Sequence, residues 1–485
     1  MANKYIKNFQ KHTPDVPQYS DRNQNYLIAG ANPTYYMDTS GTQEEQFAPL
    51  AASARWTTLS LTLDGNVVHM ISSTDSTQSV YLVTDTTHVY SIDTSYALHD
   101  LGYPTGASIS NTGCRLSIMG GYLFFTQSAS GNVWKMALPS GSWSSFSGLN
   151  SLTGPHIMET FSNFIAVCDG KTSPGTSEMV RKIDPVAFTI TSDTLSLDIG
   201  AGWSVTGLRN YNNKYLAITA SQTTLNVAGY PINYLFLWDG ISNRYNHAVK
   251  INGQYIDMRV IQGVLYVAVK VSNNKTSIYY LAGTTLRYLY TPQISKINSF
   301  TWSAVPCSLF DYRGALGVKL ESNSDVLYPL EIYNKQADTN FIHSIANNYD
   351  QIAVGFNGEI FANTYVLGGN SQIQYYNDTS SGYQELAYKS HWVPVKNLSR
   401  IDIEYDTPPQ SGSDAIHVTL DGRGEDIISG TSTTVLADIT PSTKLNNTRT
   451  PLQISGFAGD RARITLTTTN STWRPIIRKI GFIEK

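Results

Sequence analysis

Charged residues and long apolar runs are scarce in this chain of 485 residues. Asp, Glu, Lys and Arg make up 15% of it, against roughly 25% in a typical soluble protein. The formal net charge is −3, so no overall basic field argues for nucleic-acid binding. Nowhere do about 18 apolar residues follow one another, as a membrane-spanning helix requires. The opening residues MANKYIKNFQ also lack the apolar core of a signal peptide. We therefore expect a soluble protein that is not exported by the usual route.

Residues that carry common chemistry are equally sparse. Three cysteines, Cys114, Cys168 and Cys307, lie far apart in apolar contexts, which predicts small core side chains and no disulfide framework. The nine histidines show no metal-ligand spacing. No phosphate-binding loop, dinucleotide fingerprint or nucleophile elbow is present. The sequence thus predicts no catalytic residue, no cofactor-binding residue and no metal ligand.

Tyrosine and glycine, in contrast, are plentiful, with 31 and 36 residues. Extended amphipathic helical patterns are hard to find, whereas short apolar runs separated by Gly, Pro, Asn and Asp recur along the chain. Such a rhythm is typical of many short strands joined by polar turns. The predicted fold class is all-β.

The stretch VIQGVLYVAVKV at 260–271 represents the strand pattern best. It reads as two strands joined at Gln262-Gly263, and the second strand is apolar on both faces. Leu265 and Val267 lie on one face, and Tyr266 lies on the other. A strand of this kind must be covered on both sides, as in a stacked or closed assembly of sheets.

The same hairpin pattern recurs along the chain. It aligns at LTLDGNVVHM, SIMGGYLFFT, ETFSNFIAVC, RNYNNKYLAI, RVIQGVLYVA, FDYRGALGVK and, more loosely, ANNYDQIAVG. The second turn residues are types that tolerate a positive φ, and they lie 56, 42, 50, 50, 51 and 36 residues apart. This period predicts a β-propeller of six or seven blades over 55–378. Residues 1–54 are predicted to form an extended arm, and 26–37 to close the ring by pairing near 373–376.

After residue 382 the period is lost, and a second β module is predicted over 383–485. Seven short strands, one of them at 461–468, favour a β-sandwich or jelly roll. Asp402, Glu404 and Asp406 alternate with apolar residues, which predicts a strand at a solvated edge with one wet face. A calcium site on these three carboxylates is the alternative. Trp473 is expected in the core, although Trp392 and Trp473 could also stack on sugars.

Two kinds of catalytic or binding site deserve a test within the propeller. One is a carboxylate-binding triad of arginines, for which the candidates are Arg115, Arg181, Arg209, Arg244, Arg259, Arg287 and Arg313. The other is a carboxylate pair of the kind that glycoside hydrolases use. For Asp169, Asp239 and Asp311, strand ends and turns provide a sufficient explanation.

The order of an irregular arm, a propeller and a C-terminal β module resembles the structural tail proteins of tailed bacteriophages, in particular those of the nozzle or hub. The segments HWVPVKNLSRIDIEYD (391–406) and RARITLTTTNSTWRPIIRKIGFIEK (461–485) are similar to terminal β modules of phage tail proteins. The resemblance implies a non-enzymatic virion component, synthesised in the host cytoplasm, that forms a homo-oligomeric ring. It also implies contacts with other tail proteins or fibres and non-specific contact with DNA in the channel.

Two other function classes stay open at this point. A receptor- or carbohydrate-binding propeller predicts aromatic clusters at the blade tips, and a glycoside hydrolase predicts carboxylates that converge in the channel.

Overall fold

The protein is described from a computed structural model, which covers the strand backbones at 4–6, 26–29, 31–33 and 50–52 and most of 57–484. Within 57–484 the residues outside the description are 109–112, 151–154, 170–176, 193–195, 226–230, 273–274, 293–307, 313, 320–327, 335–338, 346–348, 365–369, 377–386, 391–392, 424–431, 447, 458, 469–472 and 474–475, and four more at 53–56 precede it. Every regular element in the described part is a strand. No helix there is long and apolar enough to cross a membrane.

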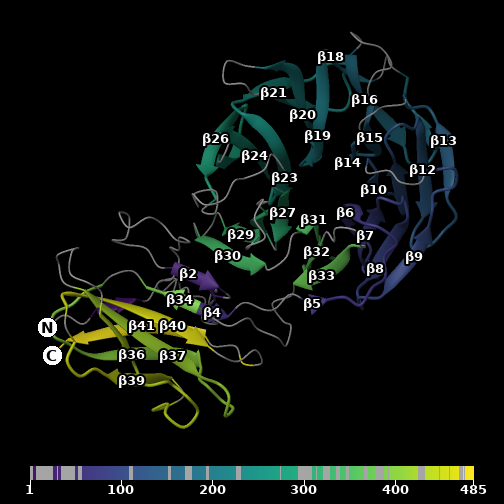
Figure 1. Cartoon of the computed structure of the whole chain (residues 1–485). Coiled ribbons are helices and arrows are strands. Elements are labelled where there is room, and N and C mark those ends of the chain that lie inside the picture. The colour runs from purple at the N-terminus through teal and green to yellow at the C-terminus, as the bar shows by residue number, and fades with distance from the viewer. Residues whose placement is uncertain are drawn as a thin grey trace.

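Six four-stranded sheets and one five-stranded sheet follow one another in a ring (Figure 1). The first sheet contains β6 (Val67–Ser72), β7 (Gln78–Thr84), β8 (Val89–Asp93) and β9 (Leu98–Gly102), and the second contains β10 (Arg115–Met119), β11 (Tyr122–Thr126), β12 (Asn132–Ala137) and β13 (Ser144–Ser147). The third contains β14 (Met158–Phe161), β15 (Phe164–Asp169), β16 (Ser177–Asp184) and β17 (Thr189–Ile190), and β18 (Leu197–Ala201) also pairs with β16. The fourth contains β19 (Trp203–Tyr211), β20 (Tyr215–Leu225), β21 (Pro231–Trp238) and β22 (His247–Ile251).

The remaining three sheets complete the ring. The fifth contains β23 (Gln254–Ile261), β24 (Val264–Ser272), β25 (Lys275–Ala282) and β26 (Thr285–Tyr290). The sixth contains β27 (Ser308–Tyr312), β28 (Ala315–Lys319), β29 (Tyr328–Asn334) and β30 (Thr339–Ile345). The seventh contains β31 (Tyr349–Val354), β32 (Ile360–Thr364), β33 (Gln372–Tyr376) and β5 (Thr57–Thr58). The first strand of each blade contacts the first strand of the next, from β6 round to β31 and back to β6. These strands therefore surround the channel, and the fold is a seven-bladed propeller.

Apolar side chains fill the space between neighbouring blades. Leu265, Val267 and Val269 of β24 pack in a cluster with residues of the preceding blade. Tyr266 and Ala268 of the same strand pack in a different cluster with residues of the following blade. This arrangement confirms the prediction that the strand is covered on both faces, because successive side chains of a strand point to opposite sides.

Five of the seven predicted hairpins join the first two strands of a blade, and the first and last do not. Asp64-Gly65 precedes β6, and the hairpin from β6 to β7 turns instead at 73–77. Gly65 accepts a hydrogen bond from Ser371 N at 3.3 Å, so this turn belongs to the contact between the last blade and the first. Tyr349-Asp350 lies within β31. The first prediction is wrong because turn-forming residues serve loops between blades as well as hairpins within them. The second is wrong because Asp350 lies at a register shift within a strand.

Closure of the ring also differs from the prediction. β5 pairs with β33 through Thr58 and Gln374, so one strand from near the N-terminus completes the last blade. Residues 26–29 form β2 (Tyr26–Ala29), which pairs with β34 (Ala387–Lys389) outside the ring. The prediction that 26–37 closes the ring is therefore wrong. The predictions that the last blade is the one completed and that an N-terminal strand completes it are confirmed.

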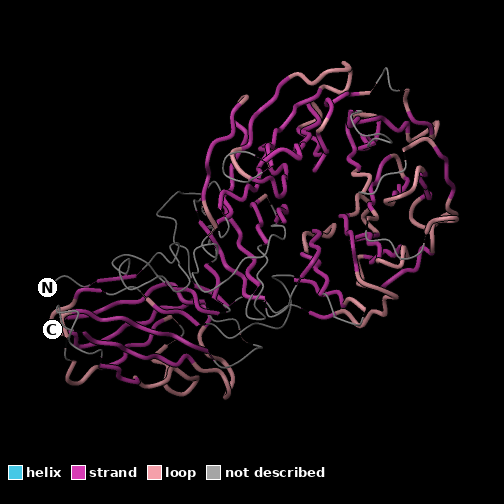
Figure 2. The backbone as a smooth tube through the Cα atoms, turned by 45° about the horizontal axis from the view of Figure 1, so that its top comes forward, coloured by secondary structure: helices cyan, strands magenta, loops and turns pink. Residues whose placement is uncertain are grey.

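A second body, here called the terminal module, contains strands from both ends of the chain (Figure 2). One sheet has the order β3 (Ala31–Pro33), β4 (Leu50–Ala52), β41 (Ile476–Glu484), β36 (Leu398–Thr407) and β39 (Arg449–Gln453), and β1 (Lys4–Ile6) also pairs with β41. The other has the order β2, β34, β40 (Arg461–Thr468), β37 (Ile416–Arg423) and β38 (Ser432–Val435), and β35 (Val393–Pro394) also pairs with β40.

One hydrophobic cluster is shared by the two sheets of the terminal module. It includes Ile403 of β36, Val418 of β37, Leu466 of β40 and Ile480 of β41, all fully buried. Trp473 packs in the same cluster, as predicted, whereas Trp392 lies outside the described residues. The prediction of an extended arm at 1–54 is corrected in one respect. The strands β1 to β4 of this segment pair within the two sheets of the terminal module. The β-sandwich and the jelly roll both stay predictions.

Candidate functional site: the charged centre of the propeller

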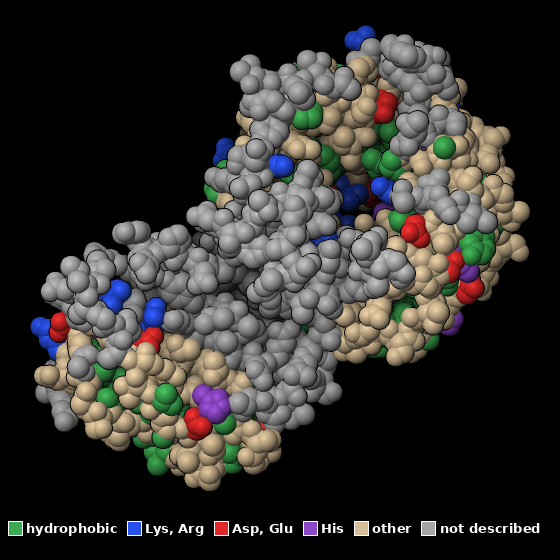
Figure 3. All heavy atoms as spheres, viewed as in Figure 1, with side chains coloured by type: hydrophobic (Ala, Val, Ile, Leu, Met, Phe, Trp, Pro, Cys, Tyr) green, Lys and Arg blue, Asp and Glu red, His purple; other side chains and the backbone are tan. Residues whose placement is uncertain are grey.

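The propeller gathers charged side chains from five blades on its innermost strands. We call this set the channel cluster, and its members are His69, Arg115, Glu159, Arg209, Asp257 and Arg259. All six are partly exposed, as expected for side chains along a channel. Figure 3 shows basic and acidic side chains inside the hollow at the centre of the ring.

Arg209 on β19 is the hub of this cluster. Its guanidinium lies 3.5 Å from Glu159 Oε2 and 3.6 Å from Asp257 Oδ1. Its Nε donates to the Met258 carbonyl at 2.9 Å. A planar guanidinium can satisfy several acceptors at once, so this one residue connects the third, fourth and fifth blades.

Two further contacts of the cluster cross between blades. The Leu116 amide donates to His69 Nδ1 at 3.1 Å, which joins the first blade to the second. The Leu309 amide donates to Asp257 Oδ2 at 2.8 Å, which joins the fifth to the sixth. Because these bonds link neighbouring innermost strands, part of the cluster holds the ring together.

Burial and mutual charge set the ionisation of these groups. Burial raises the pKa of Glu159 and of Asp257, and Arg209 partly opposes the rise at both carboxyls. Burial lowers the pKa of His69 well below its usual 6.5, and Arg115 and Arg209 lower it further. His69 is therefore neutral at neutral pH, which agrees with its Nδ1 accepting a hydrogen bond.

Of the seven arginine candidates, the structure brings Arg115, Arg209 and Arg259 together in the channel. Arg181 instead pairs with Asp169, with Nε 2.9 Å from Oδ2. Arg244 and Arg287 are exposed outside the channel, and Arg313 lies outside the described residues. The sequence could name these arginines but could not group them, because each stands on a different inner strand.

The three aspartates singled out in the sequence act mainly in loops. Asp239 accepts from the amides of Ile241 and Ser242 at 2.9 and 3.2 Å. Asp311 accepts from the Gly314 amide at 2.8 Å. Asp169 accepts from Asn150 N at 2.8 Å, so it fixes the loop before the third blade.

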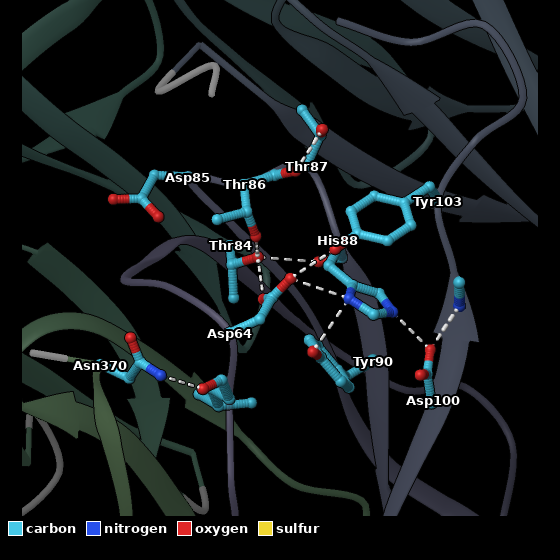
Figure 4. A network of polar contacts seen from close by, with 12 residues as sticks. Asp64, Thr84, Asp85, Thr86, Thr87, His88, Tyr90, Asp100, Tyr103 and Asn370 are labelled. Carbon is cyan, nitrogen blue, oxygen red and sulfur yellow. Dashed lines mark hydrogen bonds and ion pairs between the residues drawn. The ribbon is translucent and has the colours of Figure 1, made fainter. Parts of the chain in front are cut away.

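A second polar cluster, which sequence reasoning missed, lies in the first blade (Figure 4). His88 Nδ1 is 2.9 Å from Asp64 Oδ2, and its Nε2 is 2.5 Å from Asp100 Oδ1. The rings of Tyr90 and Tyr103 lie 4.4 and 4.1 Å from the imidazole. Burial by itself would raise the pKa of Asp64, but hydrogen bonds from four side chains lower it to about 2.

This His88 cluster stands beside the junction that closes the ring. Asn66 N donates to Asp85 Oδ1 at 2.9 Å. Val67 N donates across the junction to Ser371 Oγ of the last blade at 3.1 Å. These bonds order the loop between the last blade and the first, which indicates a structural role for the polar groups around it.

The acidic strand of the terminal module is not at a solvated edge. β36 pairs with β41 on one side and β39 on the other. Asp402 pairs with Arg400 at 2.8 Å and also contacts Arg449, and Glu404 lies 3.1 Å from Lys479. Asp406 is 2.6 Å from Arg478. Each of the three carboxylates thus has a basic partner.

Among the described residues, no three His, Cys, Asp or Glu side chains are grouped as metal ligands would be. Cys114 and Cys168 are buried in the clusters between blades, which confirms their predicted place, and Cys307 lies outside the described residues.

Two solved structures of WD40 domains are similar to part of this chain. No family model matches the chain, and no curated protein matches it. The WD40 domain of Pan2 from Neurospora crassa is similar in structure, with a TM-score of 0.46 and 10% identity over 68% of this chain and 97% of that one. The WD40 β-propeller domain of Doa1 has a TM-score of 0.44 and 9% identity over 67% of this chain and 98% of that one.

Proposed function

We propose that this chain is a non-enzymatic structural subunit of a bacteriophage tail, in the ring of proteins at the nozzle or hub. The observation that carries the proposal is the way in which the chain ends are used. One N-terminal strand, β5, closes the propeller, and four others, β1 to β4, pair within the C-terminal sheets. A subunit that bears load gains from such pairing, because the N-terminal strands are fixed within sheets and the last blade receives its fourth strand.

The ion pairs of the protein also support a structural role. Glu159 and Asp257 both approach Arg209, as carboxylates of an ion-pair network do. In the terminal module, Asp421 Oδ2 accepts from Arg463 Nε and Nη2 at 3.2 and 3.1 Å. Pairs of this kind fix strand register and neighbouring elements.

In this proposal the propeller is a rigid unit of the ring, and the terminal module contacts neighbouring subunits, tail proteins or fibres. The copies would surround the DNA channel of the particle and hold the genome until adsorption. DNA contact would be non-specific and weak, because a net charge of −3 gives no overall basic field to attract the phosphates.

Electron microscopy of labelled particles tests this proposal. An antibody against the purified protein should decorate one end of the tail in phage particles from the source culture. The purified protein alone, or with particle extracts that lack it, should assemble into rings. Labelling of host cells with no labelling of any particle would overturn the proposal.

An assay on host-surface polysaccharide distinguishes the structural proposal from a glycoside hydrolase. We expect no release of reducing ends by the wild-type protein. Release that disappears in Glu159→Gln or Asp257→Asn would show instead that the channel acids act on a glycan.

A further inference from the structure

Two arginines of the channel cluster have no carboxylate within ion-pair distance among the described residues. Within that part of the chain, Arg115 donates to the carbonyl of its neighbour Cys114 at 2.7 Å. Arg259 makes no hydrogen bond and no ion pair within the described part of the chain. Arg209, between them in the order of the ring, has two carboxylates. The positive charges of the channel are therefore unevenly matched.

The positions of these arginines place the surplus charge across the channel. Arg115 stands on β10 and Arg259 on β23, three blades further round a ring of seven. Strands β14 and β19 lie between them, each in contact with the next. The two side chains thus start from nearly opposite sides of the channel, with Arg209 on the arc between them.

The surroundings of Arg115 and Arg259 disfavour their charged forms. Burial lowers the pKa of Arg115 and of Arg259, and the positive charge of Arg209 lowers both further. The carboxylates of Glu159, Asp257 and Asp311 partly oppose the lowering of the Arg259 pKa. A guanidinium nevertheless keeps its proton in proteins. The more distant Asp311 is engaged by the Gly314 amide. The channel cluster carries three arginines against two carboxylates, and His69 is neutral. An anion that entered the channel would be attracted by the positive charge that remains.

We propose that the centre of the propeller binds an oxyanion, a carboxylate or phosphate group, between Arg115 and Arg259. The fork of N–H donors on a guanidinium matches the paired oxygens of such groups. Glu159 and Asp257 hold Arg209 in place beside the ligand and limit the net positive charge, and His69, being neutral, adds none. The proposal does not depend on the tail assignment, since any propeller with this channel would have the same site.

Calorimetric titration and thermal melting of the full-length protein with inorganic phosphate and with malonate test this inference, with chloride at equal ionic strength as the reference. We expect both oxyanions to raise the melting temperature and to bind with measurable heat, while chloride does neither. Arg115→Gln and Arg259→Gln should each weaken binding about tenfold, the effect of one lost charge-assisted contact. The double variant should not bind.

Two further variants make the outcome decisive. Arg287→Gln removes an exposed arginine on the outermost strand of the fifth blade and should bind as the wild type does. Glu159→Gln removes a competing negative charge and should bind more tightly. Binding of phosphate alone would assign the site to phosphate groups, and binding of malonate alone to carboxylates. No binding by the wild type, or equal binding by the double variant, would overturn the proposal.

Discussion

The channel of the propeller and the acidic face of the terminal module use the same residue types in opposite ways. On β36, three carboxylates each have a basic partner, and Asp402 has two. In the channel, Arg209 has two carboxylates, whereas Arg115 and Arg259 have none within ion-pair distance among the described residues. Matched charges hold strands together, and unmatched charges on a concave surface are available to a ligand.

The two bodies also differ in how far apart their paired strands stand in the sequence. Within most blades, neighbouring strands follow one another directly along the chain. In the terminal module, β1 and β4 pair with β41, which brings residues near 4 and 50 to the C-terminal strand. The propeller should therefore tolerate loss of the N-terminal strands better than the module does, provided that β5 remains.

Deletion of residues 1–52 should give the largest effect. It removes β1 to β4 and leaves β41 with only β36 as a partner, so we expect the calorimetric transition of the terminal module to be lost. The transition of the propeller should persist because β5 is retained. A matched deletion of 1–24, which removes β1 alone, should only lower the module transition. Two unchanged transitions in the longer deletion would contradict the strand pairing.

Asp402→Ala should give the second largest effect. The side chain of Asp402 is 4% exposed and pairs with Arg400 and Arg449, so its loss should destabilise the protein by about 2 kcal/mol. The control is Arg259→Gln, which removes a charge that has no ion pair among the described residues and should change stability by less than about 0.5 kcal/mol. Urea unfolding measures both. Equal losses would show that the channel arginine is as structural as the acid.

Gly263→Val tests the hairpin turn of the fifth blade. Gly263 has a φ of +76°, in the left-handed region. A β-branched residue there should cost about 1.5 kcal/mol. No neighbouring atom would touch the first added carbon closer than 3.6 Å, so the cost is one of backbone strain. Gly412→Val, in open space with an ordinary φ, is the control. A melting temperature unchanged by Gly263→Val would refute the turn.

Acid unfolding of Asp64→Asn should show the smallest effect. The pKa of Asp64 falls from the usual 3.8 to about 2 in the folded protein. A lowered pKa stabilises the fold above pH 3.8, and this contribution is lost as the pH falls toward 2. Wild-type protein should therefore lose stability relative to Asp64→Asn over that window. Parallel stability curves for the two proteins would contradict the prediction.

The repeats made the propeller predictable because each blade is a local structure. Turn residues such as Gly121 and Gly263 have positive φ, as their types indicate. Asn163 does not, and its neighbour Ser162 has the positive φ instead. The predicted module strand at 461–468 agrees with β40 in both limits. Such agreement rests on alternation and turn chemistry, which need no information from distant parts of the chain.

The sequence by itself thus determined the all-β class, the repeated blade, the core positions and the change of architecture after the repeats. Only the tertiary structure decided which N-terminal strand closes the ring, where the first four strands pair and which arginines meet in the channel. Local periodicity specifies a strand and its two faces, but the pairing of distant strands depends on the free energy of the whole assembly. The same reason applies to charge, because a side chain is matched or unmatched only once its neighbours from other blades are in place.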